Sequence, residues 1–197
     1  MRGLLLILMS LCATGAIAEN AWYAGAGAGM TNLRNGSNLD ADVGEIDTWK
    51  AGFQLFGGYK LGEQWAIEFG YLDFGEDSET TPGDPDNPAV PDNKREYSAA
   101  GIYVNGQYHI PIGSRVSLDL DGGWLFAEAE DTKTIENSFD GGQTDKYDDS
   151  GAMLGLAFTW RTTDSLYLRG SANYFLIDFD KTIKNPWRLG VDVIWDF

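Results

Sequence analysis

The sequence predicts an all-β protein, an eight-stranded antiparallel up-and-down transmembrane β-barrel. The main observation is alternation: along segments of about ten residues, apolar side chains take every second position, which is typical of a strand with two different faces. The 197 residues include 25 glycines and 13% aromatic residues, which suits strands joined by tight turns. After the N-terminal segment no stretch of roughly 18 consecutive apolar residues occurs, so a closed barrel is the remaining way to cross a membrane.

The C-terminal segment Trp187–Phe197 shows this alternation most clearly. Its apolar positions are Trp187, Leu189, Val191, Val193, Trp195 and Phe197, and mostly polar or small residues lie between them. An open sheet edge this apolar would invite aggregation, whereas a closed barrel has no edge. We therefore expect the last strand to pair with the first one and to close the barrel.

Residues 1–18 have the features of a secretory signal peptide. Arg2 supplies a positive charge, Leu4–Leu11 forms a short apolar core, and Ala16–Ala18 matches an A-x-A cleavage site. We expect residues 1–18 to be removed, which leaves residues 19–197 as one barrel domain. The only cysteine, Cys12, lies in the removed segment, so the mature chain would contain no disulfide.

Eight segments have strand character, and the connections between them alternate in length. The expected strands are Trp22–Met30, Thr48–Lys60, Trp65–Tyr71, Tyr97–Ile110, Val116–Ala127, Gly151–Arg161, Leu166–Ile177 and Trp187–Phe197. The long connections are polar and cover residues 31–47, 75–96, 128–149 and 178–186. Bacterial outer-membrane barrels have an even number of strands, short periplasmic turns and long outer loops. The pattern therefore predicts a location in the bacterial outer membrane.

Charged residues on the expected strands fall on the face opposite the large apolar residues. They are Lys50, Glu68, Asp119, Asp121, Arg161, Arg169, Arg188 and Asp192. A lysine or arginine that faces lipid near the bilayer centre costs about 2–4 kcal/mol, so we expect the charged face to point inward. A soluble eight-stranded barrel of the lipocalin type, with an apolar interior, is the alternative that this argument disfavours.

We expect the inward charges to form an ion-pair network that fills the lumen. Its expected members are Lys50, Glu68, Asp119, Asp121, Arg161, Arg169 and Arg188. Glu68 and Arg169 lie at similar heights on opposite walls and form the first predicted pair, because unpaired buried charge is costly. Asp119 and Asp121 are expected to meet Arg161 from the adjacent strand. An eight-stranded barrel is just wide enough for its own side chains, so the network predicts a plug, with a narrow channel gated by these pairs as the alternative.

The composition disfavours several other functions. A formal net charge of −16 argues against nucleic acid as a partner, because phosphates would be repelled. The sequence has no glycine-rich phosphate loop with a lysine and no Cys/His cluster, so we expect no cofactor and no metal ion. An enzyme that modifies lipid A would use a histidine and a serine. The single histidine, His109, has Ser114 and Ser117 nearby in sequence, but no motif places them together, and we expect no catalytic residues.

Four segments resemble the transmembrane barrel of the outer membrane protein A family. They read KAGFQLFGGYKLGEQWAIEFGYLDFG, LDLDGGWLFAEAEDTK, DSGAMLGLAF and RLGVDVIWDF, in this order along the chain. The resemblance implies insertion by the barrel assembly machinery with the help of periplasmic chaperones. In that process Trp195 and Phe197 would act as the C-terminal assembly signal. The resemblance also implies that Glu68 and Arg169 occupy the family's inner Glu and Arg positions.

The sequence departs from that family at three points. The family's inner Lys appears as Asn105, and no acidic residue near Phe158 and Thr159 matches its other inner Glu. The resemblance therefore does not carry over the exchange of ion-pair partners that gates the family's pore. We also expect the family's periplasmic peptidoglycan-binding domain to be absent, because the chain stops at Phe197.

The function expected from these observations is that of a structural or surface-interaction barrel in the outer membrane. It would display four long acidic extracellular loops and contact outer-membrane lipid, with an extracellular ligand that the sequence does not identify. We expect a monomer. The first alternative is a narrow channel for small solutes or ions, and the second is a barrel enzyme that modifies lipid A.

Overall fold

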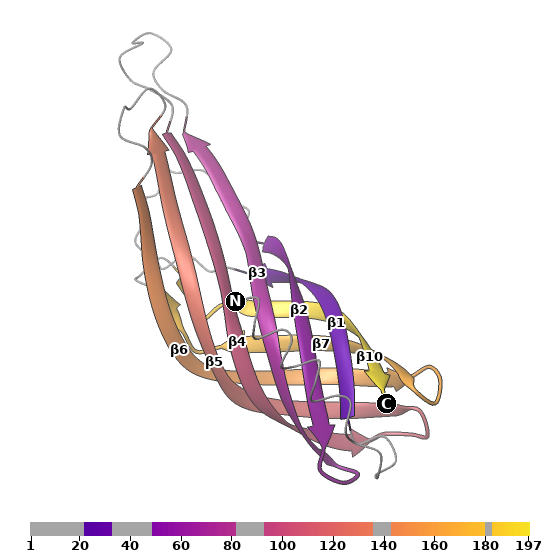
Figure 1. Ribbon diagram of the computed structural model, residues 1–197. Helices are drawn as coiled ribbons and strands as arrows, with labels where there is room; N and C mark the ends of the chain where they lie inside the picture. The colour runs from indigo at the N-terminus through magenta and orange to yellow at the C-terminus, as the bar shows by residue number, and fades with distance from the viewer. Residues whose placement is uncertain (1–21, 33–48, 82–92, 136–142, 180–182) are drawn as a thin grey trace.

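The computed structural model describes residues 22–32, 49–81, 93–135, 143–179 and 183–197, and most of them are β-strand (Figure 1). Eight antiparallel strands close into one barrel in the order β1-β10-β7-β6-β5-β4-β3-β2. Their bounds are Trp22–Asn32 (β1), Trp49–Lys60 (β2), Trp65–Thr81 (β3), Asn93–Pro111 (β4), Val116–Ile135 (β5), Gln143–Arg161 (β6), Leu166–Phe175 (β7) and Trp187–Asp196 (β10). The predicted all-β, eight-stranded up-and-down barrel is thus confirmed.

The first and last strands of the chain close the barrel. β1 pairs with β10 from Tyr23, opposite Asp196, to Asn32, opposite Trp187. The backbone N–H of Phe197 donates a further hydrogen bond to the carbonyl oxygen of Trp22, at 3.1 Å. Over the described residues of the closed part of the barrel, each strand pairs with a neighbour on both sides, so the backbone ladder has no open edge there. This is the closure that the alternating C-terminal segment predicts.

The large apolar residues lie on the outer face of this barrel. Phe53, Leu156 and Val191 are 44%, 43% and 64% exposed, whereas Glu68 and Arg169 are only 1% and 5% exposed. A barrel of the lipocalin type would show the reverse, with apolar residues inside. The orientation predicted from the charged face is therefore the one that the structure has.

Aromatic residues gather toward both ends of the outer face, where a transmembrane barrel meets the two membrane surfaces. The ring pairs at the short-turn end have centroids 4.8 Å apart for Trp22 with Tyr59 and 4.7 Å apart for Trp65 with Tyr108. At the opposite end Trp49 and Trp187 lie 4.5 Å apart. Among the described residues, no helix is long and apolar enough to cross a membrane.

Strands β3, β4, β5 and β6 continue well beyond the other four strands and form a long curved ribbon (Figure 1). The predicted loops 75–96 and 128–149 are therefore too long. The strands continue to Thr81, Asn93, Ile135 and Gln143 because their antiparallel ladders still satisfy the backbone N–H and C=O groups. Most of the predicted loop 31–47, and the prolines between residues 82 and 91, lie outside the described residues.

The predicted loop 178–186 also contains paired backbone. Asp178–Phe179 (β8) and Ile183–Lys184 (β9) are two-residue strands that form a small antiparallel sheet separate from the barrel ladder. Phe179 is 1% exposed. This segment is therefore anchored by a buried ring, and it packs against β6.

A β-bulge in β3 directs an aromatic ring into the bore. Asp73 and Gly75 pair with consecutive residues of β4, so Phe74 is the extra residue of the bulge. Gly75 has a φ of 93°, a conformation that side chains disfavour, and its N–H donates to Asp73 Oδ1 at 2.7 Å. Phe74 is fully buried, and its ring centroid lies 5.2 Å from that of Phe175.

The bulge belongs to an apolar layer inside the barrel that the sequence analysis did not predict. Its buried members include Leu72, Phe74, Leu125, Ala127, Met153, Phe175, Ile177 and Phe179. Along β3, Leu72 and Phe74 follow Glu68 in the direction of the long loops. The interior therefore has a polar layer nearer the short turns and an apolar layer nearer the long-loop end.

Candidate functional site

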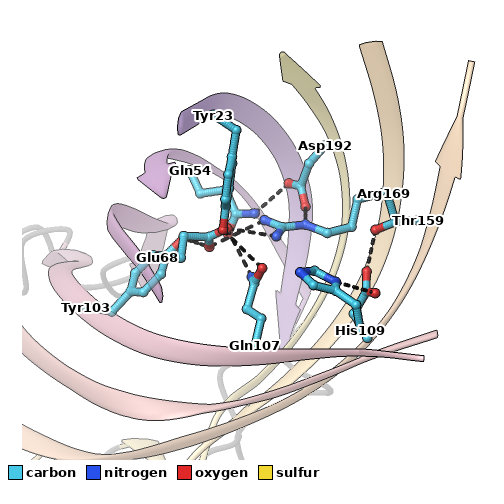
Figure 2. Close-up of polar contacts among 10 residues, drawn as sticks. Tyr23, Gln54, Glu68, Tyr103, Gln107, His109, Thr159, Arg169 and Asp192 are labelled. Carbon is cyan, nitrogen blue, oxygen red and sulfur yellow. Dashed lines mark hydrogen bonds and ion pairs between the residues drawn. The ribbon is translucent and has the colours of Figure 1, made fainter. Parts of the chain in front are cut away.

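The polar layer is centred on Arg169 of β7, which bridges two buried carboxylates (Figure 2). Its Nη1 lies 2.8 Å from Glu68 Oε2, and its Nε lies 2.9 Å from Asp192 Oδ2. The guanidinium carbon lies 4.3 Å from the centroid of the Phe56 ring, within the range of a cation–π contact. Glu68 and Arg169 are the pair expected to meet across the bore, and the structure brings them together from β3 and β7, on opposite walls.

Glu68 has neutral hydrogen-bond partners as well. The Tyr103 hydroxyl donates to Oε1 at 2.8 Å, and the Gln107 side-chain N–H donates to Oε2 at 3.0 Å. The Tyr23 hydroxyl lies 3.1 Å from Gln107 Oε1 and 3.3 Å from Glu68 Oε2. On the other side of Arg169, Gln54 donates to Asp192. A buried carboxylate with this many donors is satisfied without solvent.

Missing side chains at two glycines let these groups approach the barrel wall. A Cβ at Gly27 would lie 1.8 Å from Asp192 Oδ1, and a Cβ at Gly70 would lie 2.4 Å from the Tyr103 ring. Distances this short cannot be accommodated unless the neighbouring group moves. The glycines of the inner wall therefore make room for the network.

A second polar cluster lies nearer the short turns and is centred on Asp119 of β5. His109 Nδ1 lies 2.8 Å from Asp119 Oδ1, and the Ser117 hydroxyl donates to the same oxygen at 2.8 Å. The Thr159 hydroxyl donates to the other carboxylate oxygen. His109 and Ser117 thus both bind the carboxylate, and among the described contacts no hydrogen bond joins one to the other. This is not the nucleophile–base pairing that acyl transfer uses.

Arg161 does not join this cluster, which corrects the expectation that Asp119 and Asp121 would meet it. Its Nη2 lies 2.7 Å from Asp164 Oδ1, and its side chain is 45% exposed. Arg161 is the last residue of β6, where an acidic residue three positions further along the turn competes as a partner. Asp121 is buried in the bore. Lys50, also predicted for the network, is half-buried near the long-loop end of β2.

Arg188 is the least satisfied of the predicted network residues. Its side chain is fully buried, yet Nε, Nη1 and Nη2 have no hydrogen-bond partner among the described residues. The guanidinium lies over two glycines, since a Cβ at Gly29 or at Gly190 would come within 2.8 Å or 2.3 Å of it. It lies opposite Thr31 in the β1–β10 register, at the long-loop end of the bore.

The side chains proposed as the assembly signal lie on the outer face. Trp195 is 60% exposed and Phe197 is 48% exposed, both at the short-turn end. Beside them, on the inner side, Lys60 forms an ion pair with the buried carboxylate of Asp196. The last strand is thus fixed to the barrel through its backbone and through Asp196, while its aromatic rings stay accessible to lipid.

The ribbon carries an acidic groove on its outer side, where β3 to β6 leave the barrel. The groove has a volume of about 780 Å³, and its acidic lining residues are Asp73, Glu76, Glu128, Glu130, Asp148 and Asp149. Lys146 lies nearby and forms ion pairs with Glu128 and Glu130. The hydrogen bond from Lys146 lowers the pKa of Glu130, and the same contact raises the pKa of Lys146. The surface around the groove stays anionic.

The network includes four residues that the sequence analysis did not single out. They are Tyr23, Gln54, Tyr103 and Gln107, all of which are buried. The alternation along each strand gave their direction, but their partners lie on strands far apart in sequence. Among the described residues, no cluster of three or more histidine, cysteine or acidic side chains is placed to hold a metal ion.

The family described as "Outer membrane protein beta-barrel domain" matches residues 4–195 of the sequence. The chain belongs to this family. Membership confirms the predicted relationship to outer membrane protein A-like barrels and the outer-membrane location. Removal of residues 1–18 stays a prediction, because these residues lie outside the described structure.

Three solved outer-membrane proteins have folds similar to that of this chain. They are Ail, the attachment invasion locus protein of Yersinia pestis, the N-terminal β-barrel domain of Pseudomonas aeruginosa OprF, and a major outer membrane protein from Thermus thermophilus. Their sequence identities are 15%, 14% and 11%, and their TM-scores are 0.55, 0.53 and 0.55. The matches cover 90%, 91% and 90% of this chain and 100%, 98% and 98% of theirs.

At these identities the likeness shows the fold alone. None of the curated proteins matches this chain in sequence.

Proposed function

We propose that this outer-membrane barrel is a closed structural anchor that presents an acidic ribbon at the cell surface. The observation that carries the proposal is the filling of the bore. The Glu68–Arg169–Asp192 network occupies the polar layer, and rings such as Phe74 and Phe175 occupy the layer above it. An anchor of this kind stabilises the envelope and holds the extended β3–β6 strands outside the membrane.

The small size of the described cavity beside the network supports closure rather than conduction. The cavity beside Glu68 and Arg169 has a volume of about 10 Å³, which is room for one water molecule. A hydrated ion or a small solute would have to displace the buried Arg169 and Phe74 side chains. Because buried side chains at these positions are hydrogen-bonded or packed, such displacement is costly.

The ribbon supports a role in surface interaction. The groove lining includes six carboxylates beside apolar residues such as Tyr71, Ile102 and Phe126, and the carboxylates favour cationic partners and repel polyanions. Ail of Yersinia pestis, which has the same fold, was solved in complex with the heparin analogue sucrose octasulfate. A polyanion of that kind is a poor match to the acidic groove, so we propose a different class of surface partner for this chain.

Planar-bilayer recordings of the refolded protein test the proposed closure. We expect no steady conductance from preparations whose folding has been verified by heat-modifiable migration on a gel. Steady openings of uniform size would contradict the closed-anchor proposal.

A narrow channel is the second candidate, and one observation favours it. Arg188 and Asp121 leave polar atoms in the bore without hydrogen-bond partners among the described residues, and water can solvate such atoms. Uniform steady openings in the same recordings would favour this candidate, and their reversal potential in a salt gradient would give the ion selectivity.

A further inference from the structure

The groove on the outer side of the ribbon begins at an apolar row of side chains. Tyr71 of β3, Ile102 of β4 and Phe126 of β5 are direct neighbours in the strand register. They are 38%, 61% and 52% exposed, and all three line the groove. A transmembrane barrel leaves the bilayer where its outer face turns polar. Because acidic residues follow this row directly, the groove opens at the membrane surface.

Two further rows of paired residues form the floor and the acidic walls of the groove. The first row consists of Asp73, Ala100, Glu128 and Asp148, and the second consists of Glu76, Ser98, Glu130 and Lys146. The β4 members, Ala100 and Ser98, are small and lie between the carboxylates of β3 and those of β5. They therefore form the floor, and the carboxylates on either side form the walls.

The charges of the walls favour an occupant with several positive charges. Lys146 compensates part of the β5 wall through its ion pairs with Glu128 and Glu130. Asp73, Glu76 and Asp148 form no ion pair with another described residue. In the described part of the chain, no three acidic or histidine side chains converge closely enough to hold a metal ion. Separated cationic groups therefore suit these walls better than one metal ion.

The width of the groove determines the shape of that occupant. Its walls lie on β3 and β5, on either side of β4, so the wall backbones are about 10 Å apart. An α-helix with its side chains is about 10–12 Å across and does not fit between the wall side chains. An extended chain presents every second side chain to the same face, at steps of about 7 Å. The three rows of the groove repeat at the same interval because they follow β4.

We propose that the groove binds an extended cationic amphipathic peptide at the membrane surface, with an apolar residue followed by cations at the second and fourth positions after it. The apolar side chain packs on Ile102 and Phe126. The first cation lies between Asp73 and Glu128, and the second lies beside Glu76. The groove volume of about 780 Å³ is within the range of ligand sites, about 300–1,000 Å³. This inference rests on the proposed surface role of the ribbon and names the class of partner that the ribbon takes.

Calorimetric titration with three short peptides tests the spacing. The probe FSKSKS, with acetylated and amidated ends, carries its apolar residue and its two lysines at alternate positions. The peptide FSSKKS has the same composition and charge with the spacing broken, and SSKSKS lacks the aromatic residue. The refolded protein is placed in phosphatidylcholine nanodiscs, and binding to empty nanodiscs is subtracted. We expect FSKSKS to bind about ten-fold more tightly than SSKSKS and several-fold more tightly than FSSKKS.

Matched variants assign the effect to the groove. Phe126→Ala should remove most of the preference for FSKSKS over SSKSKS, whereas Phe158→Ala, at an outward ring of similar exposure near the short turns, should keep it. Asp148→Asn should weaken FSKSKS binding several-fold, and Asp164→Asn, at an exposed carboxylate of a short turn, should not.

The outcomes separate this inference from the surface role on which it rests. Equal binding of the three peptides to the wild type, or an unchanged preference in Phe126→Ala, would overturn the amphipathic-peptide site alone. The same holds if hexalysine binds and none of the three peptides does. Failure of all four peptides to bind would overturn the cationic surface role as well.

Discussion

Arg169 is held more tightly than any exposed arginine could be, because it contacts two buried carboxylates and an aromatic ring at once. The contribution of Arg169 to stability is seen mainly when it is removed, because Glu68 and Asp192 would then remain buried without a counter-charge. Removing one partner of a buried ion pair costs about 3–5 kcal/mol, because the remaining charge stays buried without compensation. An exposed ion pair contributes about 0–1 kcal/mol.

Two arginine substitutions separate these cases. Arg169→Met leaves Glu68 and Asp192 uncompensated, so we expect the free energy of unfolding in lipid vesicles to fall by about 3–5 kcal/mol. Arg161→Met removes the exposed pair with Asp164 and should cost less than about 1 kcal/mol. Adding Glu68→Gln and Asp192→Asn to Arg169→Met should recover much of the loss. Equal effects of the two single variants would mean that Arg169 is solvated.

Close approach to glycine is a second property of single residues. Gly70→Ala would place a Cβ 2.4 Å from the Tyr103 ring, so we expect a loss of about 1–3 kcal/mol from overpacking. Gly170 on the outer face has no atom within 4 Å of the corresponding position, and Gly170→Ala should be neutral within about 0.5 kcal/mol. Urea unfolding of both variants provides the measurement. A tolerated Gly70→Ala would show that the Tyr103 contact with Glu68 is loose.

At the scale of strands, the β3–β6 ribbon should bind cations through its acidic groove. We expect hexalysine to bind the protein in neutral detergent at low salt, and Glu76→Gln with Asp148→Asn to weaken binding several-fold. The matched control is Glu63→Gln with Asp164→Asn, which removes two exposed carboxylates at the short-turn end. Equal losses in the two double variants, measured by fluorescence anisotropy, would point to net charge instead of the groove.

The sequence predicts the strands within the barrel well because one physical rule governs them. Lipid on one side and a packed bore on the other give each position a face, so alternation locates Phe53, Val191 and Glu68 correctly. The ribbon lacks that contrast, since its polar residues meet water. Backbone pairing therefore determines the ends of β3 and β6, and these ends cannot be predicted from the amino-acid composition. The bulge at Phe74 cannot be predicted from the sequence either, because an apolar ring is compatible with both the lipid-facing side and the bore.

The sequence predicts which face of a strand a residue occupies better than it predicts which residue is its ion-pair partner. Glu68 and Arg169 were found because each is the prominent inward charge at its height on opposite walls. Arg161 was assigned to the wrong partner because it ends a strand, where the nearby turn supplies Asp164 at 2.7 Å. Tyr103 and Gln107 have no charge to mark them, although Glu68 needs both as donors. The order of residue types along a strand indicates whether a side chain points into the bore or outward. The side chain that it contacts there depends on how all eight strands curve around the bore.

At the scale of the whole molecule, the account depends on a barrel with an apolar exterior and a bore filled by its own side chains. Val191 and its outward neighbours cover the outside, and the Arg169 network with the Phe74 layer closes the inside. The anchor and the ribbon both need this arrangement. A protein with the opposite orientation would be soluble and would have none of them.

Spin labels at single cysteines test this arrangement most directly, since Cys12 is the only native cysteine. In a Cys12→Ser background, labels at Val191 and at Ser171 are compared in lipid bilayers by collision with oxygen and with a water-soluble nickel chelate. The account predicts a Val191 label that collides often with oxygen and rarely with nickel, and a Ser171 label shielded from both. A Val191 label that nickel reaches as readily as a free label in water would contradict it.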